Sequence, residues 1–176
     1  VVSVSKKEQR IGGAGNVALN LASLGSPVHL ISVLGNDEEA EMLEKLLAEK
    51  KIGTGYVLKS EGRVTTNKIR IISRNQHMMR LDAEISTPLS AAEEDALLEN
   101  FKNYLEAEKP AIVILEDYNK GVHTEKVISA VISLCKKNNV LTAVDPKRKN
   151  FFEYIGVDIF KPNLKEAKEG LNIIGD

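Results

Sequence analysis

The stretch AIVILEDYNKG, residues 111–121, joins an uninterrupted apolar run to a polar loop that ends in glycine. Such a run of β-branched and aliphatic residues is typical of a strand with both faces covered, as in a parallel sheet. In open α/β sheets, ligands bind in the crevice outside the carboxyl ends of the parallel strands. The stretch therefore predicts the type of sheet and also the edge of the sheet at which a site would lie.

The rest of the chain repeats this alternation of apolar strands and amphipathic helices. Strands are expected at 28–33, 111–115, 140–144 and 157–160. Helices are expected at 16–24, after Asn36 or Asp37, from the capping box Ser90–Glu93 to about Glu108, after Thr124, and from Leu164 onward. Apolar strands separated by helices indicate parallel pairing with helices on both sheet faces. The expected fold is therefore α/β, with a three-layer α/β/α core and a mostly parallel sheet.

Two segments depart from this alternation. Val1–Gln9 and Arg63–Asp82 mix polar and apolar residues, which is typical of antiparallel strands with one solvated face. In the second segment, Val64–Ser73 and His77–Leu81 flank Arg74-Asn75-Gln76, which predicts a hairpin turn. Two interpretations stay open: a meander at the edge of the sheet, or a small β-flap that projects over a site.

The bulk composition excludes several classes of function. The chain has 176 residues with 43% hydrophobic residues and a net charge of −1, which suits one domain or part of a larger one. A nucleic-acid or anionic-membrane partner would favour a strong basic excess, which is absent. A single cysteine, Cys135, rules out an internal disulfide and suits a reducing compartment. With no apolar run long enough to span a bilayer and no visible secretory signal, the expected location is the cytoplasm.

Glycines crowd the start of a predicted helix in RIGGAGNVALNLASLG, residues 10–25. The spacing from Gly13 matches a dinucleotide-binding fingerprint, but the preceding residues Ser5–Arg10 are too polar for the buried strand that this motif requires. No Gly-Lys-Ser/Thr follows, which excludes a Walker loop. A close backbone approach at Gly12 and Gly13 remains, with Asn16 in the first helical turn able to meet hydroxyls or an anion. The alternative is a tight helix entry without a ligand.

Polar residues follow two of the predicted strands directly. Asp117 and Lys120 come after the first strand, where a carboxylate and an ammonium group suit a metal–phosphate complex. Asp145 and Lys147 come after the second, in a run of three cations that suits phosphate oxygens. A solvated loop and a basic surface patch are the simpler interpretations of the two segments.

A third polar strand end carries Asn163 and Glu166 in the segment KPNLKE. Three residues apart at the start of a helix, both side chains can reach one point. Glu166 could also be only a capping residue. The strand ends at 117, 145 and 163 should line one rim of one sheet, and this convergence is the strongest purely physical argument for a site.

Taken together, GGAGNVALNLASLG, EDYNKG, DPK and KPNLKE resemble the ribokinase-type (PfkB) family of sugar kinases. TTNKIRIISRNQHMMRLD (65–82), EDYNKGV, DPKRKNFFEY and FKPNLKE are similar to the kinase domains of ADP-heptose synthases, which phosphorylate the anomeric oxygen of D-glycero-β-D-manno-heptose 7-phosphate for lipopolysaccharide biosynthesis. The resemblance covers the whole chain. It implies a single partial kinase domain at 1–176 with a β-lid at about 1–11 and 63–82 and an α/β core at about 12–62 and 83–176.

The resemblance also implies roles for the candidate residues. The sugar would be approached by Gly12, Gly13, Asn16 and Asp117, and the phosphate-transfer region and nucleotide by Lys120, Asp145, Lys147, Asn163 and Glu166. Asn163 and Glu166 would organise Mg²⁺ and the ATP phosphates, largely through water. The lid would cover the sugar and form a homodimer contact. Our own hypothesis adds that the lid cations Lys68, Arg70 and Arg80 meet the 7-phosphate of the substrate.

The chain departs from the family pattern at both ends. No core strand with a sugar-binding aspartate precedes Val1, and Ile173–Asp176 is not the Gly-Ala-Gly-Asp motif that carries the general base. We therefore expect a fragment that is inactive as given, without the nucleotidyltransferase domain of bifunctional relatives. The alternatives left open are a related kinase for fructose, ribose or a hexose phosphate, and a non-catalytic sugar-binding or dimerisation module. A dinucleotide oxidoreductase would require NAD to contact Gly13.

Overall fold

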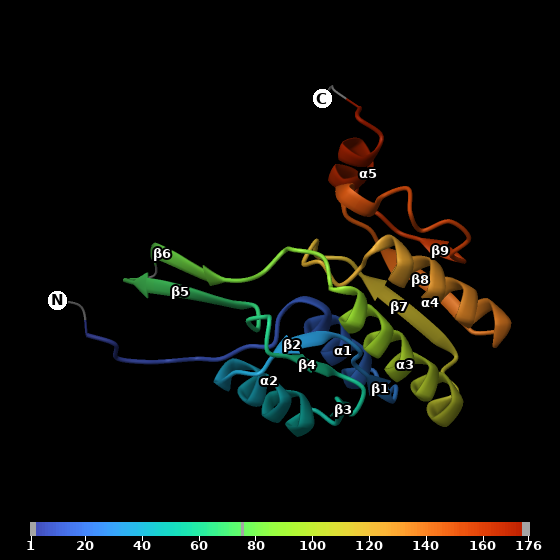
Figure 1. Cartoon of the computed structure of the whole chain (residues 1–176). Helices are drawn as coiled ribbons and strands as arrows, with labels where there is room; N and C mark the ends of the chain where they lie inside the picture. Colours follow the sequence, from blue (N-terminus) through green and yellow to red (C-terminus); the bar gives the residue numbers. More distant parts are fainter. Residues whose placement is uncertain (1–2, 75, 174–176) are drawn as a thin grey trace.

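The computed structural model describes residues 3–74 and 76–173. The helices are α1 (Gly13–Ser23), α2 (Glu38–Glu49), α3 (Ala91–Glu108), α4 (Glu125–Lys137) and α5 (Leu164–Gly170), with a short 3₁₀ helix at Arg148–Asn150. The strands are β1 (Val28–His29), β2 (Val33–Gly35), β3 (Ile52–Gly53), β4 (Leu58–Ser60), β5 (Asn67–Ser73), β6 (Gln76–Ala83), β7 (Ile112–Glu116), β8 (Leu141–Asp145) and β9 (Ile159–Phe160). Figure 1 shows their arrangement.

The strand pairing confirms an α/β fold with mostly parallel sheet. Strands β7, β8 and β9 pair in parallel, as do β1 with β3 and β2 with β4, whereas β5 and β6 are antiparallel. The single strand expected at 28–33 is two short strands. Val28 pairs with Ile52 and Val33 pairs with Leu58, so the chain changes partner strand between them and the ladder is interrupted.

One hydrophobic core joins α3 and α4 to the sheet beneath them. The two helices lie side by side in front of β7 and β8 (Figure 1). Buried members of this core are Leu97, Phe101, Tyr104 and Leu105 on α3, Val127, Ile128 and Val131 on α4, and Leu115 and Val144 on the strands. A smaller cluster around Ala18, Leu47 and Ile52 packs α1 and α2 against β3. The buried residues of α3 lie on one face, as expected for an amphipathic helix.

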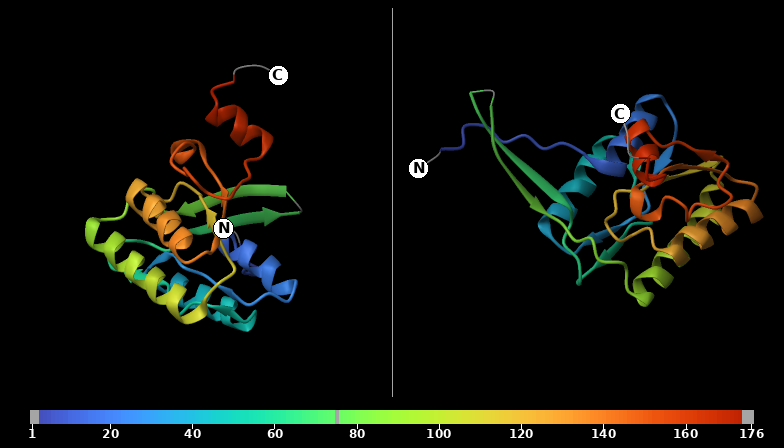
Figure 2. Two further views of the ribbon diagram at one scale, coloured as in Figure 1. Left: turned by 90° about the vertical axis from the view of Figure 1, so that its right-hand side faces the viewer. Right: turned by 90° about the horizontal axis from the view of Figure 1, so that it is seen from above.

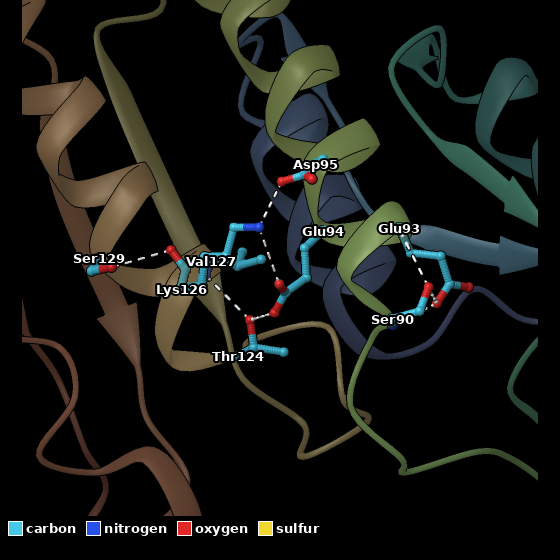
Figure 3. Close-up of polar contacts among 8 residues, drawn as sticks. All are labelled: Ser90, Glu93, Glu94, Asp95, Thr124, Lys126, Val127 and Ser129. Atoms are coloured by element: carbon cyan, nitrogen blue, oxygen red, sulfur yellow. Dashed lines mark hydrogen bonds and ion pairs between the residues drawn. The ribbon is translucent and has the colours of Figure 1, made fainter.

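The first turns of α3 and α4 are capped and tied to each other. The predicted capping box is present, since Ser90 Oγ accepts the N–H of Glu93 at 3.3 Å and the Glu93 carboxylate accepts the N–H of Ser90 at 2.8 Å. Thr124 caps α4 and also donates its hydroxyl to Glu94 (Figure 3). Lys126 reaches Glu94 and Asp95 across the helix pair. These contacts fix the chain that precedes each helix.

The segment expected to be a β-flap forms a two-stranded antiparallel ribbon, β5–β6, that projects from the body (Figures 1 and 2). The pairs Lys68–Asp82 and Arg70–Arg80 lie on one face, and Ile69–Leu81 and Ile71–Met79 lie on the other. The predicted turn residue Asn75 lies outside the described residues. The projecting flap, rather than an edge meander, is therefore the observed arrangement.

The strand expected within Val1–Gln9 is a wrong prediction for the described part, since residues 3–9 form no strand. In Figure 1 they extend from the body on the same side as the ribbon. A strand requires a partner backbone, and within the described chain no strand pairs with this segment. Its polar residues are exposed, so alternation alone did not provide a buried face for pairing.

Asp37 joins helix α2 to the entrance of the ribbon. Its carboxylate accepts the N–H of Ala40 at 2.9 Å as a helix cap and the N–H of Thr65 at 2.7 Å. Burial would raise the pKa of Asp37, but the hydrogen bonds from Thr65 and Ala40 outweigh it and hold this pKa below its usual value. The ionised carboxylate therefore stabilises the fold.

Asp37→Ala is expected to lower the free energy of unfolding at pH 7 by about 1–2 kcal/mol, the usual effect of losing a helix cap. Because the folded pKa is depressed, this contribution is complete above the unfolded pKa of about 3.9 and is lost as the pH falls through the folded value. Urea denaturation of the wild type and Asp37→Ala across pH 2–7 measures it. The gap between the two should close on acidification, and a constant gap would contradict the assignment.

Candidate functional site

The predicted convergence of strand ends is present. Glu116 and Asp145 are paired residues at the carboxyl ends of β7 and β8, and the N–H of Asp117 donates to Asp145 O at 3.2 Å. The N–H of Lys161 donates to Val144 O at 3.0 Å, which holds the segment after β9 against the same edge. We call this edge the rim: residues 116–121, 145–149 and 161–166.

Three predicted nucleotide-side residues meet at the start of α5. Asn163 caps the helix by accepting the N–H of Glu166 at 2.9 Å, and Glu166 Oε2 accepts the N–H of Asn163 at 2.8 Å. The other Glu166 oxygen accepts Lys147 Nζ. Glu166 is 5% exposed, so this carboxylate is both a cap and a buried partner of a rim lysine. Lys147 in turn lies 5.8 Å from the centre of the Tyr118 ring.

Acidic groups crowd this part of the rim. Burial, then the Glu166 carboxylate, raises the pKa of Asp145, against the attraction of Lys161 and Lys147. Burial, then Asp145, raises the pKa of Glu116. Burial would also raise the pKa of Glu166, but Lys147 and the N–H of Asn163 hold it low. The carboxyls repel one another, so a cation placed among them would be attracted strongly.

One oxygen donor in this acidic cluster is open to a divalent cation. Asp145 Oδ1 is buried and forms no hydrogen bond with any described residue. Within residues 3–74 and 76–173, no three His, Cys, Asp or Glu side chains form a complete metal cage. Mg²⁺ is usually held by one or two carboxylates together with waters and substrate phosphates. An open oxygen on Asp145 beside Glu166 fits that kind of site.

The glycine-rich entrance also lies beside Tyr118. Helix α1 starts at Gly13, three residues before its expected start, with Gly12 extended and no side-chain cap. Gly13 has a φ of +54°, and a Cβ there would lie 3.8 Å from the Tyr118 ring. Asn16 is exposed, and its amide bonds to no other described residue. Helix α1 thus begins beside Tyr118 without a side-chain cap, and the exposed amide of Asn16 lies in its first turn.

Asp117 is a buried residue of the rim. It is 3% exposed and accepts Asn150 Nδ2 at 2.9 Å, Tyr154 Oη at 2.8 Å and the N–H of Asn119 at 2.8 Å. Tyr154 Oη also contacts His123 Nδ1 at 3.0 Å. Since the hydroxyl donates to Asp117, the imidazole donates to the hydroxyl, which assigns the proton to Nδ1. Burial lowers the pKa of His123 and raises that of Tyr154, so both stay neutral.

Sequence reasoning missed this buried network. Asn150 and Tyr154 lie in the stretch DPKRKNFFEY, which had been noted only for its resemblance to sugar kinases. They bond to a residue more than 30 positions away, and no local spacing signals such a contact. The described contacts of the Asp117 carboxylate are all within the protein, and its predicted sugar contact stays a prediction.

Lys120 lies with the ribbon and apart from the nucleotide-side residues. Its Nζ is 2.7 Å from Glu84 Oε1, and Glu84 Oε2 is 2.7 Å from Lys68 Nζ. Arg63, at the base of the ribbon, donates to Lys120 O at 2.7 Å and to Thr87 O at 3.2 Å. The residues predicted to bind the nucleotide are therefore not all together: Lys120 lies at the ribbon, and Lys147 lies beside Glu166.

The other ribbon cations lie on the charged face. Arg80 Nε pairs with Asp82 at 2.9 Å, and Arg70 stands directly opposite Arg80 in the ladder. Arg70 is exposed and pairs with no carboxylate of the described residues. Like charges that face each other across a ladder are unfavourable unless an anion lies between them.

The chain is similar to known proteins over almost its whole length. The sequence profile described as "pfkB family carbohydrate kinase" matches residues 1–173. Two relatives are proteins called "Bifunctional protein HldE", from Aliarcobacter butzleri (38% identical over 98% of this chain) and Syntrophotalea carbinolica (36% identical over 100%). In each case the match covers 36% of the relative, so the chain spans about a third of the length of these curated proteins.

Solved structures share the fold. Phosphofructokinase-2 from Escherichia coli, in a structure titled as a tetrameric inhibited form, gives a TM-score of 0.70 at 20% identity, covering 97% of this chain and 58% of that one. The 2-dehydro-3-deoxygluconokinase from Thermotoga maritima gives a TM-score of 0.70 at 16% identity, covering 92% of this chain and 53% of that one.

None of the helices in the described ranges is long and apolar enough to cross a membrane.

Proposed function

Since the chain belongs to the pfkB family of carbohydrate kinases, we propose that it takes part in the transfer of a phosphoryl group from ATP to the anomeric hydroxyl of D-glycero-D-manno-heptose 7-phosphate. The reaction would serve ADP-heptose and lipopolysaccharide biosynthesis in the cytoplasm. The observation that carries the proposal is that one ring, Tyr118, lies beside both the uncapped glycine-rich helix entrance at Gly13 and Lys147, the partner of Glu166. The match to proteins named HldE supports the choice of substrate.

On the sugar side, the proposal uses the first turn of α1. The backbone N–H groups after Gly12 have no side-chain cap, and the amide of Asn16 has both donors and an acceptor available for hydroxyls. The positive end of the helix dipole also favours an anionic oxygen there. These groups would orient the sugar so that its anomeric hydroxyl faces the rim.

On the nucleotide side, Lys147 would bind phosphate oxygens, while Asp145, Asn163 and Glu166 would hold a hydrated Mg²⁺. Bound Mg²⁺ and ATP would supply the phosphoryl group and neutralise charge during transfer. In this reaction class the protein contributes mainly position and electrostatics. The crowded acidic groups and the unpartnered Asp145 oxygen support a cation at this end of the rim.

The ribbon would act as the lid of the site. Its charged face, with Lys68, Arg70 and Arg80, would attract the 7-phosphate of the substrate. Its opposite face carries the exposed apolar residues Ile69, Ile71, Met79 and Leu81. We propose that this apolar face forms the homodimer contact, because an isolated two-stranded ribbon gains stability when an apolar face is covered.

The function is tested by thermal unfolding of the chain with a panel of ligands: D-glycero-D-manno-heptose 7-phosphate, fructose 6-phosphate, ribose and NAD. A ligand that binds only the folded state stabilises it by RT ln(1 + [L]/Kd), about 1.4 kcal/mol at ten times Kd. The heptose phosphate should raise the melting temperature most. A larger shift with ribose or fructose 6-phosphate would indicate a sister kinase, and a shift with NAD alone would contradict a sugar kinase.

A further inference from the structure

One carboxylate holds cations from two different parts of the site. Glu84, just after β6, accepts Lys68 Nζ from the ribbon on Oε2 and Lys120 Nζ from the rim on Oε1, both at 2.7 Å. Lys68 also contacts Asp82 at 2.9 Å. The two ammonium groups therefore converge on a single small anion. Two oxygens of a phosphate group have a spacing close to that of a carboxylate, so the same pair of cations suits phosphate equally well.

Lys120 is held in place independently of Glu84. Arg63 donates to its carbonyl oxygen at 2.7 Å and to Thr87 O at 3.2 Å. The N–H of Leu89 donates to Gly121 O at 3.1 Å, which ties the next residue of the rim to the end of the ribbon segment. Removing the Glu84 carboxylate would therefore leave the backbone of Lys120 where it is and free only its ammonium group.

The contact is accessible and fully charged. The side chains of Lys68, Lys120 and Glu84 are 35%, 29% and 30% exposed, so a ligand can reach all three. The ammonium groups of Lys120 and Lys68 lower the pKa of Glu84 to about 2. Glu84 is therefore ionised at neutral pH, and an incoming anion would have to displace a charged carboxylate. A phosphate monoester, with a charge of about −1.5 to −2 at pH 7, is the stronger competitor for two cations.

We propose that Glu84 is a built-in competitor for the substrate's phosphate, and that Lys68 and Lys120 exchange its carboxylate for phosphate oxygens when a phosphorylated sugar binds. This inference rests on the proposed function and deepens it, because it identifies a phosphate subsite between the ribbon and the rim. A sugar without a phosphate cannot displace Glu84. The contact would therefore select phosphorylated sugars and draw the ribbon and the rim onto one ligand.

The test compares calorimetric affinities of the wild-type chain, Glu84→Gln and the matched control Glu44→Gln. Glu44 pairs with Lys59 at 2.9 Å, so the control removes the same kind of exposed ion pair away from the site. Without its competitor, the lysine pair should bind fructose 6-phosphate and heptose 7-phosphate about three- to tenfold more tightly, as expected for one or two exposed ion pairs. Glu44→Gln should match the wild type, and affinity for ribose should not change in either variant.

A second pair of variants, Lys120→Met alone and combined with Glu84→Gln, tests whether the gain in phosphate affinity depends on Lys120. Lys120→Met should remove the gain from Glu84→Gln in the double variant, since one of the two freed cations is then missing. Inorganic phosphate serves as the minimal probe, because it tests the lysine pair without any sugar contact. Unchanged or weaker phosphate binding by Glu84→Gln, for every phosphorylated probe, would overturn the inference, as would a gain that persists in Glu84→Gln with Lys120→Met.

The outcomes separate this inference from the proposed function. If heptose 7-phosphate binds tightly and Glu84→Gln leaves its affinity unchanged, Glu84 is not a competitor for phosphate. The substrate assignment would then still stand. A gain with fructose 6-phosphate or inorganic phosphate, together with no binding of the heptose phosphate, would support the subsite and contradict the substrate assignment.

Discussion

Replacing Asp117 with alanine is expected to lower the free energy of unfolding by about 3–5 kcal/mol, a loss typical of breaking a buried charged network. The carboxylate is 3% exposed and accepts three hydrogen bonds, from Asn150, Tyr154 and the N–H of Asn119. Without it, the buried donors of Asn150 and Tyr154 lose this acceptor, and each unsatisfied buried donor costs about 1–3 kcal/mol. Urea denaturation of the wild type and Asp117→Ala measures the loss.

Tyr154→Phe is the graded control for Asp117→Ala. It removes one donor and leaves the carboxylate with two others, so a smaller loss of about 1.5–3 kcal/mol is expected, the range for a hydrogen bond to a charged group. If Asp117 served only the sugar, Asp117→Ala would weaken binding and leave stability almost unchanged. A stability loss below about 1 kcal/mol would therefore contradict the buried-network interpretation.

Gly121→Ala is expected to destabilise the fold by about 3 kcal/mol or more, for two reasons that can be separated. Gly121 has a φ of +78°, which an L side chain rarely adopts. A Cβ there would also lie 1.8 Å from Thr87 O and 2.6 Å from Thr87 C, which are backbone atoms of the returning ribbon segment. The backbone would have to shift, and the junction between the rim and the ribbon would open.

Gly25→Ala separates the two contributions. Gly25 has a similar φ of +86°, but a Cβ there would meet nothing within 4 Å. Its substitution should cost only the left-handed conformation, about 1–2 kcal/mol. Denaturation of both variants then gives the steric contribution by difference, expected to be about 1–2 kcal/mol or more. Equal losses for the two glycines would show that Thr87 does not restrict position 121.

Asp117 and Gly121 both lie in rim segment 116–121. This segment lies between the glycine-rich entrance of α1 and the ribbon. Asp117 anchors the loop from below, and Gly121 and Arg63 anchor its end to the base of the ribbon. Tyr118 and Lys120, between these anchors, face the glycine entrance and the ribbon respectively. A loop held at both ends can present its side chains at fixed positions, which a phosphoryl-transfer site requires.

The parts of the fold with strong local signals were predicted from sequence. The capping box at Ser90 gave the start of α3, and the apolar run after Ala111 gave β7 within one residue. Helix α1 begins earlier than expected because glycines have no side chain to signal a cap. The strand break after His29 was not visible, since it depends on which strands pair with β1 and β2.

The candidate site was predicted in outline only. Strand-end spacing brought Asp145, Lys147 and Glu166 together correctly, because parallel strands end at the same edge. Spacing does not say which way a side chain turns from a loop. It therefore could not show that Asp117 faces inward to Tyr154, nor that Lys120 turns to the ribbon. Glu84 had no motif around it, and its importance follows only from the lysines that reach it.

Calorimetric titration with D-glycero-D-manno-heptose 7-phosphate tests most directly whether the uncapped entrance of α1 binds a phosphorylated sugar beside the rim. The wild type is compared with Asn16→Ala and with Asn20→Ala, an exposed asparagine one turn further along the same helix. We predict selective binding over ribose, about five- to tenfold weaker in Asn16→Ala, as expected for one lost hydrogen bond, and unchanged in Asn20→Ala. Equal affinities for the two variants, or binding of ribose as tight as that of the heptose phosphate, would contradict the claim.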